Sequence, residues 1–345
     1  MHDVIVVGGG PAGLYTAGIL ARRGLNVRIL EEHKKIGQPV QCSGLVSVNI
    51  RDFAAPPREC ILNRVRGAII HSPSGRRIVL DKGRTAAYVI DRSSFDRQLS
   101  RGLGESILLG CRAEKIITAD DYVGVRDSNG RAHRSRMLLG CDGPNSVVGK
   151  HFRAVPKRVL QGVIAVTGER DNSDMVDVFI DRRFAPEGFL WRIPRGDSVE
   201  YGMWSERSGF RALESFFGIR NYEKRGGLIP LGPPKTYFER TLLIGDAAAQ
   251  VKPWSGGGVV YSMACGSMAA EVTAKAFLRG DFSEGFLKEY ERRWKSVVGK
   301  RIVASMAARR VFENMSNKGI ERVFVMLSVL QGRILNSLDM DFIVM

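Results

Sequence analysis

The sequence predicts an α/β fold with three parts: a discontinuous Rossmann-like lobe, a mainly antiparallel β-sheet lobe and a helical C-terminus. The first observation is an apolar, β-branched run over residues 4–7, which ends in the glycine pattern of residues 8–13 and is followed by a helical pattern. The second is the alternation of apolar and polar residues over 155–180 and 190–204, which is typical of antiparallel strands. The third is another buried strand pattern with an acidic end over residues 242–246, which indicates that the chain returns to the first lobe.

The N-terminal glycines have the Gly-x-Gly-x-x-Gly spacing of a dinucleotide-binding loop between a strand and a helix. Gly8 permits the tight turn, Gly10 lets the backbone approach a pyrophosphate, and Gly13 lets the helix pack closely on the strand. The helix N-terminus then offers N–H groups and a positive dipole to the phosphates. A second strand over residues 26–30 ends at Glu31, whose carboxylate is placed to accept hydrogen bonds from ribose hydroxyls.

The remaining elements follow from the same patterns. Strands are predicted over residues 66–71, 77–80, 86–90, 106–111, 116–125 and 135–139, and helices over 93–103, 256–278 and from 284 to the end. The predicted domains are a nucleotide-binding lobe of residues 1–60, 86–150 and 236–282, a substrate lobe of residues 61–85 and 151–235, and a helical C-terminal region of residues 283–345.

Composition and charge narrow the class of protein. The chain has 345 residues, 44% of them hydrophobic, as in ordinary globular proteins. Its five cysteines lack C-x-x-C spacing and its five histidines lack metal-ligand spacing, so we expect free thiols and no metal. No signal peptide and no membrane-spanning run are expected. The net charge of +16 would attract nucleic acid, anionic lipid or phosphorylated substrates, but no nucleic-acid motif accompanies it, and we expect a solvated basic surface.

Three further motifs lie where ligand-binding residues are expected. Arg92 begins a helix directly after a predicted strand, and its side chain is placed to reach a bound cofactor. Asp142-Gly143 ends one strand, and Gly245-Asp246 ends another. A glycine-rich stretch over residues 252–259 then begins a helix. Each Asp-Gly or Gly-Asp pair alone is a common turn, but their order and spacing together are specific.

In this order the motifs resemble those of the FAD-dependent oxidoreductases of the aromatic-hydroxylase type, and most closely the geranylgeranyl reductase family. Archaeal members of that family saturate the isoprenoid chains of membrane lipids. The resemblance covers residues 1 to about 280 and implies an FAD-binding lobe. The cofactor-binding residues it implies are Gly8, Gly10, Ala12, Gly13, Glu31, Cys42, Ser43, Gly44, Arg92, Ala113, Asp246, Gly257, Gly258 and Val259.

A substrate motif also resembles that family. Residues 186–194 read Pro-Glu-Gly-Phe-Leu-Trp-Arg-Ile-Pro and resemble the lipid-site pattern P-x-x-Y-x-W-x-F-P, with Phe189 in place of Tyr and Ile193 in place of Phe. Phe189, Trp191 and Ile193 share one face of a strand. Spacing alone is typical of an ordinary core face, whereas the resemblance implies the wall of an apolar substrate cavity. Lys252 departs from the family, which has Asp before the following Pro.

The loop over residues 36–47, with a cysteine followed by glycine, also resembles the family. The resemblance implies that Cys42 lies near the flavin as a catalytic residue, where its thiol would deliver a proton or tune the flavin. The alternative is a backbone contact to FAD with an inert side chain. The other four cysteines are expected to be small core residues: Cys60, Cys111, Cys141 and Cys265.

The function that these resemblances imply is FAD-dependent reduction of C=C bonds in the geranylgeranyl chains of a prenyl lipid, with electrons from NAD(P)H, ferredoxin or another carrier. One alternative is an FAD monooxygenase or halogenase, because Phe189–Pro194 also resembles a halogenase W-x-W-x-I-P pattern. Another is a flavin electron-transfer protein without its own substrate. The expected location is cytoplasmic, with the basic, amphipathic helices over residues 292–310 either packed on the body or in peripheral contact with a membrane.

Overall fold

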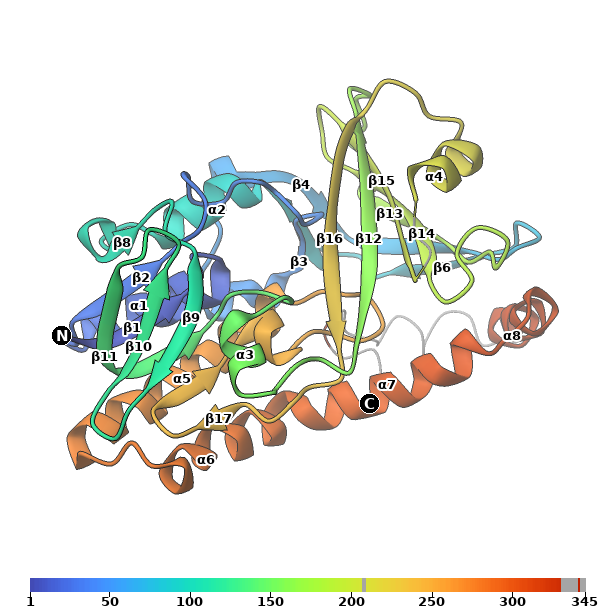
Figure 1. Cartoon of the computed structure of the whole chain (residues 1–345). Helices are drawn as coiled ribbons and strands as arrows, with labels where there is room; N and C mark the ends of the chain where they lie inside the picture. Colours follow the sequence, from blue (N-terminus) through green and yellow to red (C-terminus); the bar gives the residue numbers. More distant parts are fainter. Residues whose placement is uncertain (207–208, 330–340, 342–345) are drawn as a thin grey trace. The chain divides into compact units, whose positions relative to one another are not determined.

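The computed structural model describes residues 1–206, 209–329 and 341 (Figure 1). The chain forms two compact units. The first unit contains Met1–Val40, Arg92–Val159 and Pro230–Ile302. The second contains Gln41–Asp91, Leu160–Ile229 and Val303–Met345. The predicted domain boundaries differ from these. Residues 41–60 and 86–91 belong to the second unit because β3 and β4 pair with β7, and the C-terminal region is divided near residue 302.

A sheet with a parallel centre forms the middle of the first unit. Its strands run in the order β17-β18-β11-β1-β2-β8, and β1 pairs in parallel with both β11 and β2. The strand bounds are β1 His2–Val7, β2 Val27–Leu30, β8 Ile107–Leu108, β11 Ala132–Gly140, β17 Tyr237–Phe238 and β18 Thr241–Leu243. Because β1, β11 and β18 are parallel, their carboxyl ends meet at one edge of the sheet, which is where ligands bind in such folds.

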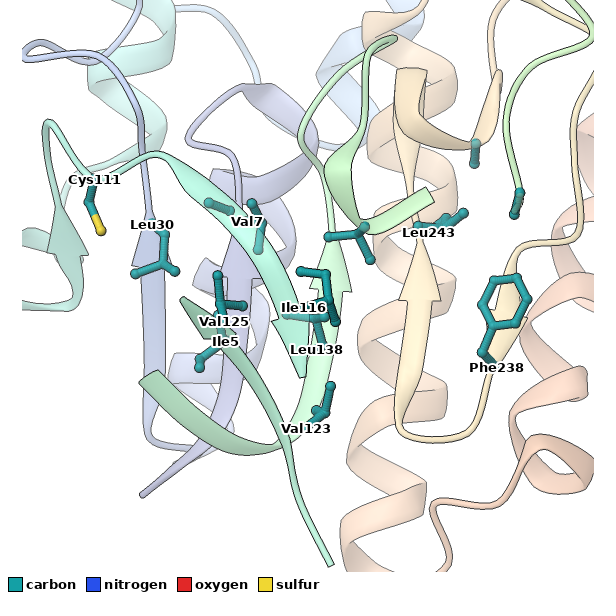
Figure 2. Packing of buried hydrophobic residues seen from close by; sticks show 14 residues of the cluster. Ile5, Val7, Leu30, Cys111, Ile116, Val123, Val125, Leu138, Phe238 and Leu243 are labelled. Carbon is teal, nitrogen blue, oxygen red and sulfur yellow. The ribbon is translucent and has the colours of Figure 1, made fainter. Parts of the chain in front are cut away.

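The predicted single strand over residues 116–125 is instead a hairpin. β9 spans Ala113–Thr118 and β10 spans Val123–Asp127, and the two pair antiparallel around a turn that contains Asp120 and Asp121. Two consecutive aspartates favour a turn over a strand interior. In Figure 2, Ile116, Val123 and Val125 of this hairpin belong to the same buried cluster as Ile5 and Leu138 of the parallel strands. The hairpin therefore covers one face of the sheet.

Helices complete the first unit. They are α1 Pro11–Arg22, α2 Arg92–Leu99, α3 Val147–His151, α5 Val259–Arg279 and α6 Glu284–Trp294, with 3-10 helices at Gly104–Ser106 and Gly245–Ala248 and a π-helix at Lys295–Gly299. Proline at the first position of α1 is favourable because its missing N–H needs no partner there. α5 packs closely on α1, since a Cβ at Gly266 would lie 2.4 Å from Thr16 Oγ1. Gly280, at φ +67°, ends α5 in the left-handed conformation.

Two sheets form most of the second unit. A seven-stranded sheet has the order β16-β12-β15-β14-β13-β5-β6, and a three-stranded sheet has the order β3-β7-β4. The bounds are β3 Leu45–Ser47, β4 Ile61–Val65, β5 Gly67–His71, β6 Arg77–Asp81, β7 Ala87–Ile90, β12 Arg158–Thr167, β13 Met175–Phe179, β14 Phe189–Pro194, β15 Val199–Ser205 and β16 Glu223–Leu231. The larger sheet is antiparallel except where β13 pairs with β5.

The helices of the second unit are short or near the end of the chain. They are α4 Phe210–Phe217, α7 Lys300–Glu313 and α8 Asn317–Val329, with 3-10 helices at Val48–Asp52 and Arg58–Cys60. The boundary between the units falls within α7. The prediction of a helical C-terminus is confirmed up to Val329, and residues 330–340 and 342–345 lie outside the described residues.

Candidate functional site

The glycine loop after β1 has two positions that the chain itself fills. Gly8 has φ +102°, and a Cβ there would lie 2.3 Å from the carbonyl oxygen of Cys141. A Cβ at Gly13 would lie 2.0 Å from the carbonyl oxygen of Gly8. The first glycine therefore permits the turn beside β11, and the third permits α1 to pack against that turn, as the sequence predicted.

Gly10 differs from its neighbours because a Cβ there would meet nothing within 4 Å. Gly10 is the N-cap of α1, where backbone N–H groups lack helical partners, and the first turn has no acidic residue. Open space, N–H groups without helical partners and a positive helix end fit the pyrophosphate of a dinucleotide. The geometry is that of an anion-binding loop.

Glu31 follows β2 and is 8% exposed. Its Oε2 accepts a hydrogen bond from the N–H of Gly9 at 2.6 Å, and its Oε1 accepts one from the N–H of His33 at 2.8 Å. These bonds fix the carboxylate beside the glycine loop. The role in ribose binding stays a prediction.

Asp246 lies in the turn after β18, and Arg92 is the first residue of α2. Burial raises the pKa of Asp246 to about 6, and the positive charge of Arg92 opposes that shift. Arg92 also donates hydrogen bonds to Asp96 at 3.1 and 3.0 Å. A Cβ at Gly258 would lie 2.9 Å from Asp246 Oδ1. Residues far apart in the sequence thus come together near the start of α5.

The two glycine-rich segments of the first unit meet at Gly245. Gly245 has φ +70°, and a Cβ there would lie 3.0 Å from the Cβ of Ala12 in α1. In the loop before α5, the N–H of Lys252 donates to the carbonyl oxygen of Gly257 at 3.0 Å. Val259 begins α5. This convergence supports the predicted order of motifs around one binding edge.

Two predicted site positions have clear packing roles. Ala113 is 6% exposed and belongs to the hydrophobic cluster beneath the β9–β10 hairpin, so its assignment to the cofactor stays a prediction. Asp142 binds the start of α3: its Oδ1 accepts from Ser146 Oγ at 2.6 Å and its Oδ2 from the N–H of Val147 at 2.7 Å. The Asp142-Gly143 motif therefore positions a helix.

Residues 41–47 of the predicted cysteine loop belong to the second unit. Cys42 is partly exposed, and its Sγ accepts a hydrogen bond from the N–H of Gly44 at 3.4 Å. Gly44 has φ +72°, and a Cβ there would lie 2.2 Å from the carbonyl oxygen of Ile90. The N–H of Leu45 donates to Ser43 Oγ at 3.3 Å. The loop is thus a built turn in which Gly44 cannot be replaced without displacement of the backbone.

The predicted substrate face is on β14. Ile193 is 2% exposed and belongs to a hydrophobic cluster with residues of β4 and β7, so in this structure it is a core residue. Phe189 and Trp191 remain partly exposed. Their rings meet edge to face with centroids 6.0 Å apart, and Phe189 also contacts Trp204 at 5.1 Å. Phe189 and Trp191 thus keep some exposed surface, although Trp191 also packs against the cluster that contains Ile193, and their contact with a substrate stays a prediction.

Glu200 and Arg195 are functional candidates that the sequence reasoning missed. Glu200 Oε1 accepts from Trp191 Nε1 at 2.9 Å, and Glu200 Oε2 accepts from Arg195 Nη1 at 2.9 Å. The same Arg195 nitrogen donates to the carbonyl oxygen of Ser43 at 2.6 Å. Burial raises the pKa of Glu200, and Arg195 opposes that shift. One signal existed: a lone carboxylate in the otherwise uncharged strand β15.

A second unforeseen cluster lies beside the β9–β10 hairpin. Asp127 Oδ2 accepts hydrogen bonds from Cys111 Sγ at 3.2 Å and from His133 Nε2 at 2.8 Å, and one ligand atom from each residue lies within 4.8 Å of the others. Burial raises the pKa of the Cys111 thiol to about 12, with a contribution from its bond to Asp127. The set has donors that a metal ion uses, but its groups already satisfy one another as a hydrogen-bonded network.

Comparisons with known proteins extend along almost the whole chain. A family model described as lycopene cyclase protein matches residues 3–338. Digeranylgeranylglycerophospholipid reductase 2 of Methanothermobacter thermautotrophicus is 31% identical, and the match covers 98% of this chain and 94% of that protein. The solved structure of a geranylgeranyl bacteriochlorophyll reductase-like protein from Thermoplasma acidophilum has a TM-score of 0.90 at 23% identity, over 99% of this chain and 94% of the other. The flavin-dependent halogenase CmlS has a TM-score of 0.68 at 16% identity, over 87% of this chain and 63% of the other, which reflects shared fold.

None of the helices in the described residues has the length and apolar character needed to cross a bilayer.

Proposed function

This chain belongs to the digeranylgeranylglycerophospholipid reductase family, and on that basis we propose that it reduces C=C bonds in the geranylgeranyl chains of membrane phospholipids with FAD as its cofactor. The observation that carries the proposal is the 31% identity to a relative of that name over 98% of this chain. The fold, which this chain shares with flavin-dependent enzymes, and the geometry of the first unit support the cofactor.

The proposal places FAD on the first unit. In the proposal, the N–H groups at the start of α1 bind the pyrophosphate next to Gly10, and Glu31 binds the ribose hydroxyls. Arg92, Asp246 and the N–H groups of residues 257–259 serve the flavin end. A bound reduced flavin supplies the hydride for alkene reduction, and the protein orients the groups around it.

The second unit supplies the substrate contacts in this proposal. An isoprenoid chain has no polar groups along its length, so it is bound by burial against apolar surface, worth roughly 25 cal/mol per Å². Phe189 and Trp191 present such surface on β14. Cys42 is the proposed proton donor or flavin-tuning residue, with a thiol that is partly exposed.

The proposal also includes the partners of the enzyme. NAD(P)H and ferredoxin are its candidate electron donors. Peripheral membrane contact is assigned to α7, where Val303 is 70% and Val311 is 67% exposed beside the basic residue Arg310. Part of the basic helical region is otherwise engaged: Arg293 pairs with Glu271 and Lys295 with Glu291. The proposed location is the cytoplasm, with peripheral contact on the inner face of the membrane.

Anaerobic single turnover tests the proposed reaction. The purified holoprotein is reduced with dithionite, freed of excess reductant and mixed with digeranylgeranylglycerophospholipid in detergent micelles. Reoxidation of the flavin together with a product heavier by two hydrogens per reduced bond is expected. A flavin that stays reduced with the lipid unchanged, and that reoxidises only when O2 is then admitted, would contradict the proposal and favour a monooxygenase, a halogenase or an electron-transfer protein.

Cys42 variants test the proposed catalytic thiol in the same assay. Cys42→Ala and Cys42→Ser are expected to retain FAD but to reoxidise roughly 10²- to 10⁴-fold more slowly, the usual contribution of a general acid or base. Cys60→Ala, at the buried cysteine of the same unit, is the matched control and should turn over normally. Equal rates and products in all the variants would show that the Cys42 thiol is inert.

A further inference from the structure

The ion pair of Glu200 and Arg195 is buried inside the second unit. Glu200 is 0% and Arg195 is 7% exposed, and every residue of β15 is buried. A buried ion pair contributes little net stability compared with apolar side chains, because desolvation offsets the attraction between the charges. Its value to a protein is more often geometric, since both partners accept only a narrow range of positions.

Each member of this pair has a second partner, and the two partners come from separate parts of the proposed site. Glu200 accepts the indole N–H of Trp191 at 2.9 Å, and Arg195 donates to the carbonyl oxygen of Ser43 at 2.6 Å. Ser43 is adjacent to Cys42. A continuous chain of hydrogen bonds therefore joins the aromatic face of β14 to the cysteine loop.

Both ends of this chain have little freedom on their other sides. The Trp191 indole lies over Gly202 of β15, where a Cβ would come within 2.1 Å of its ring. The cysteine loop is fixed at Gly44 by the close carbonyl of Ile90. At its start, a Cβ at Gly227 would lie 2.8 Å from the carbonyl oxygen of Gln41. The ion pair thus connects the Trp191 indole, which is packed on β15, to the cysteine loop, which is packed against β7 and β16.

We propose that Glu200 and Arg195 are a positioning pair that sets the indole of Trp191 and the Cys42 loop relative to each other, and thereby determines which double bonds of the lipid are reduced. The inference rests on the proposed function for its effect on products. Its structural part, the position of the Cys42 loop, is independent of that function. Neither residue is assigned a contact with the reacting atoms.

The test uses the full-length, FAD-loaded double variant Glu200→Gln/Arg195→Met. Removal of both charges leaves no unpaired buried charge to unfold the protein. The amide introduced at position 200 would still accept the indole N–H, whereas the thioether introduced at position 195 would leave the Ser43 carbonyl without its donor. Glu169→Gln is the matched control, because Glu169 accepts from Tyr201, the next residue of the same strand, at 2.8 Å and has no bond to the loop.

The first measurement is the rate at which iodoacetamide alkylates Cys42, followed by mass spectrometry of the peptide that contains it. We expect alkylation to be at least about tenfold faster in the double variant and unchanged in Glu169→Gln, with circular dichroism like wild type in both. The second measurement is the distribution of partly reduced lipid products, which should shift in the double variant along with kcat, with little change in KM.

A folded double variant with wild-type alkylation and wild-type products would overturn the inference. If the double variant fails to fold, Arg195→Lys is the second variant, since it keeps the charge but not the planar fork, and unchanged alkylation there would equally overturn it. A wild-type protein that reduces no lipid would refute the proposed function alone, because the alkylation rates decide the positioning role without turnover.

Discussion

Gly10 of the first unit and two glycines of the second unit differ in what occupies the space beside them. In the first unit, a Cβ at Gly10 would meet nothing within 4 Å, although Gly8 in the same loop is packed against Cys141. In the second unit, a Cβ at Gly188 would lie 1.7 Å from the carbonyl oxygen of Trp204, and one at Gly202 would lie 2.1 Å from the ring of Trp191. The glycine loop after β1 thus leaves room beside Gly10, whereas the chain itself fills the space beside Gly188 and Gly202.

The charged groups show the same contrast. Asp246 of the first unit is partly exposed, and its pKa is raised to about 6 although Arg92 opposes the shift. Glu200 of the second unit is fully buried, and both of its oxygens accept hydrogen bonds. A partly exposed carboxylate can still contact a ligand, whereas buried polar groups that satisfy one another are suited to fixed geometry.

Of the substitutions that test this comparison, a change at Gly10 should have the largest effect, which is on FAD binding. Gly10→Val should fold, because the space beside it is open and its backbone is in the extended region. Its side chain would occupy the position of the pyrophosphate, so we expect colourless protein and an FAD dissociation constant raised at least about 100-fold, or roughly 2.7 kcal/mol. Fluorescence titration with FAD measures the dissociation constant, and circular dichroism measures whether the variant is folded.

Gly8→Ala is the companion variant for that experiment. Its Cβ would overlap the Cys141 carbonyl, and φ +102° is unfavourable for alanine, so we expect loss of folded protein as well as of cofactor. A Gly10→Val protein that bound FAD as tightly as wild type would remove the distinction between the two glycines.

Substitution of Gly202 should have an intermediate effect that is confined to the second unit. In Gly202→Ala the new methyl group would displace the Trp191 indole, and overpacking of this kind costs about 1–3 kcal/mol of unfolding free energy. Lipid turnover should fall while FAD stays bound. Gly168→Ala, where a Cβ would meet nothing within 4 Å, is the control and should be neutral in urea unfolding. Equal stability of the two variants would contradict the assigned packing.

The smallest expected effect concerns the hydrogen-bonded network of Cys111, Asp127 and His133 beside the β9–β10 hairpin. Burial raises the pKa of Asp127, but hydrogen bonds from His133, Cys111 and two backbone N–H groups more than offset this, and the pKa falls from 3.8 to about 2. A lowered pKa in the folded state means that the stabilisation is present above about pH 4 and is lost as the pH falls towards 2. Asp127→Asn should therefore lose about 1–2 kcal/mol at pH 7.

Urea unfolding at several pH values measures this difference. The gap in unfolding free energy between wild type and Asp127→Asn should shrink as the pH falls from about 4 towards 2. Asp121→Asn, at the exposed turn of the same hairpin, is the control and should show no such gap. A gap that stays constant across this pH range would show that the Asp127 carboxylate is not the source of the stabilisation.

Local patterns predicted the elements of the first unit well, because short-range physical constraints determine them. The glycine loop, the strand before it and the helix after it are all present, and Glu31 lies at the end of β2. The strand over 116–125 was wrong, since a turn at Asp120 and Asp121 divides it into β9 and β10. The consecutive aspartates were the local signal for this break.

The candidate site was predicted only in part, because some of its contacts join residues that are far apart in the sequence. Phe189 and Trp191 share a strand face, as spacing requires, but the burial of Ile193 depends on residues of β4 and β7 that are far away in the sequence. Glu200 and Arg195 were missed because their role depends on a contact with Ser43, more than a hundred residues earlier in the chain. The Cys111, Asp127 and His133 network was missed because no metal-like or catalytic spacing joins its members.

The glycine loop, the alternation of the strands and the family motifs could be predicted from the sequence, because each depends on neighbours within a few residues or on the fixed periods of strand and helix. Only the tertiary structure decided that Gly10 has open space and Gly202 does not, and that a buried ion pair joins Trp191 to the loop of Cys42. The bond from Arg195 to Ser43 joins residues that lie 152 positions apart, and the register of β14 on β15 places Gly202 under the Trp191 ring, so no pattern within a few residues encodes either contact.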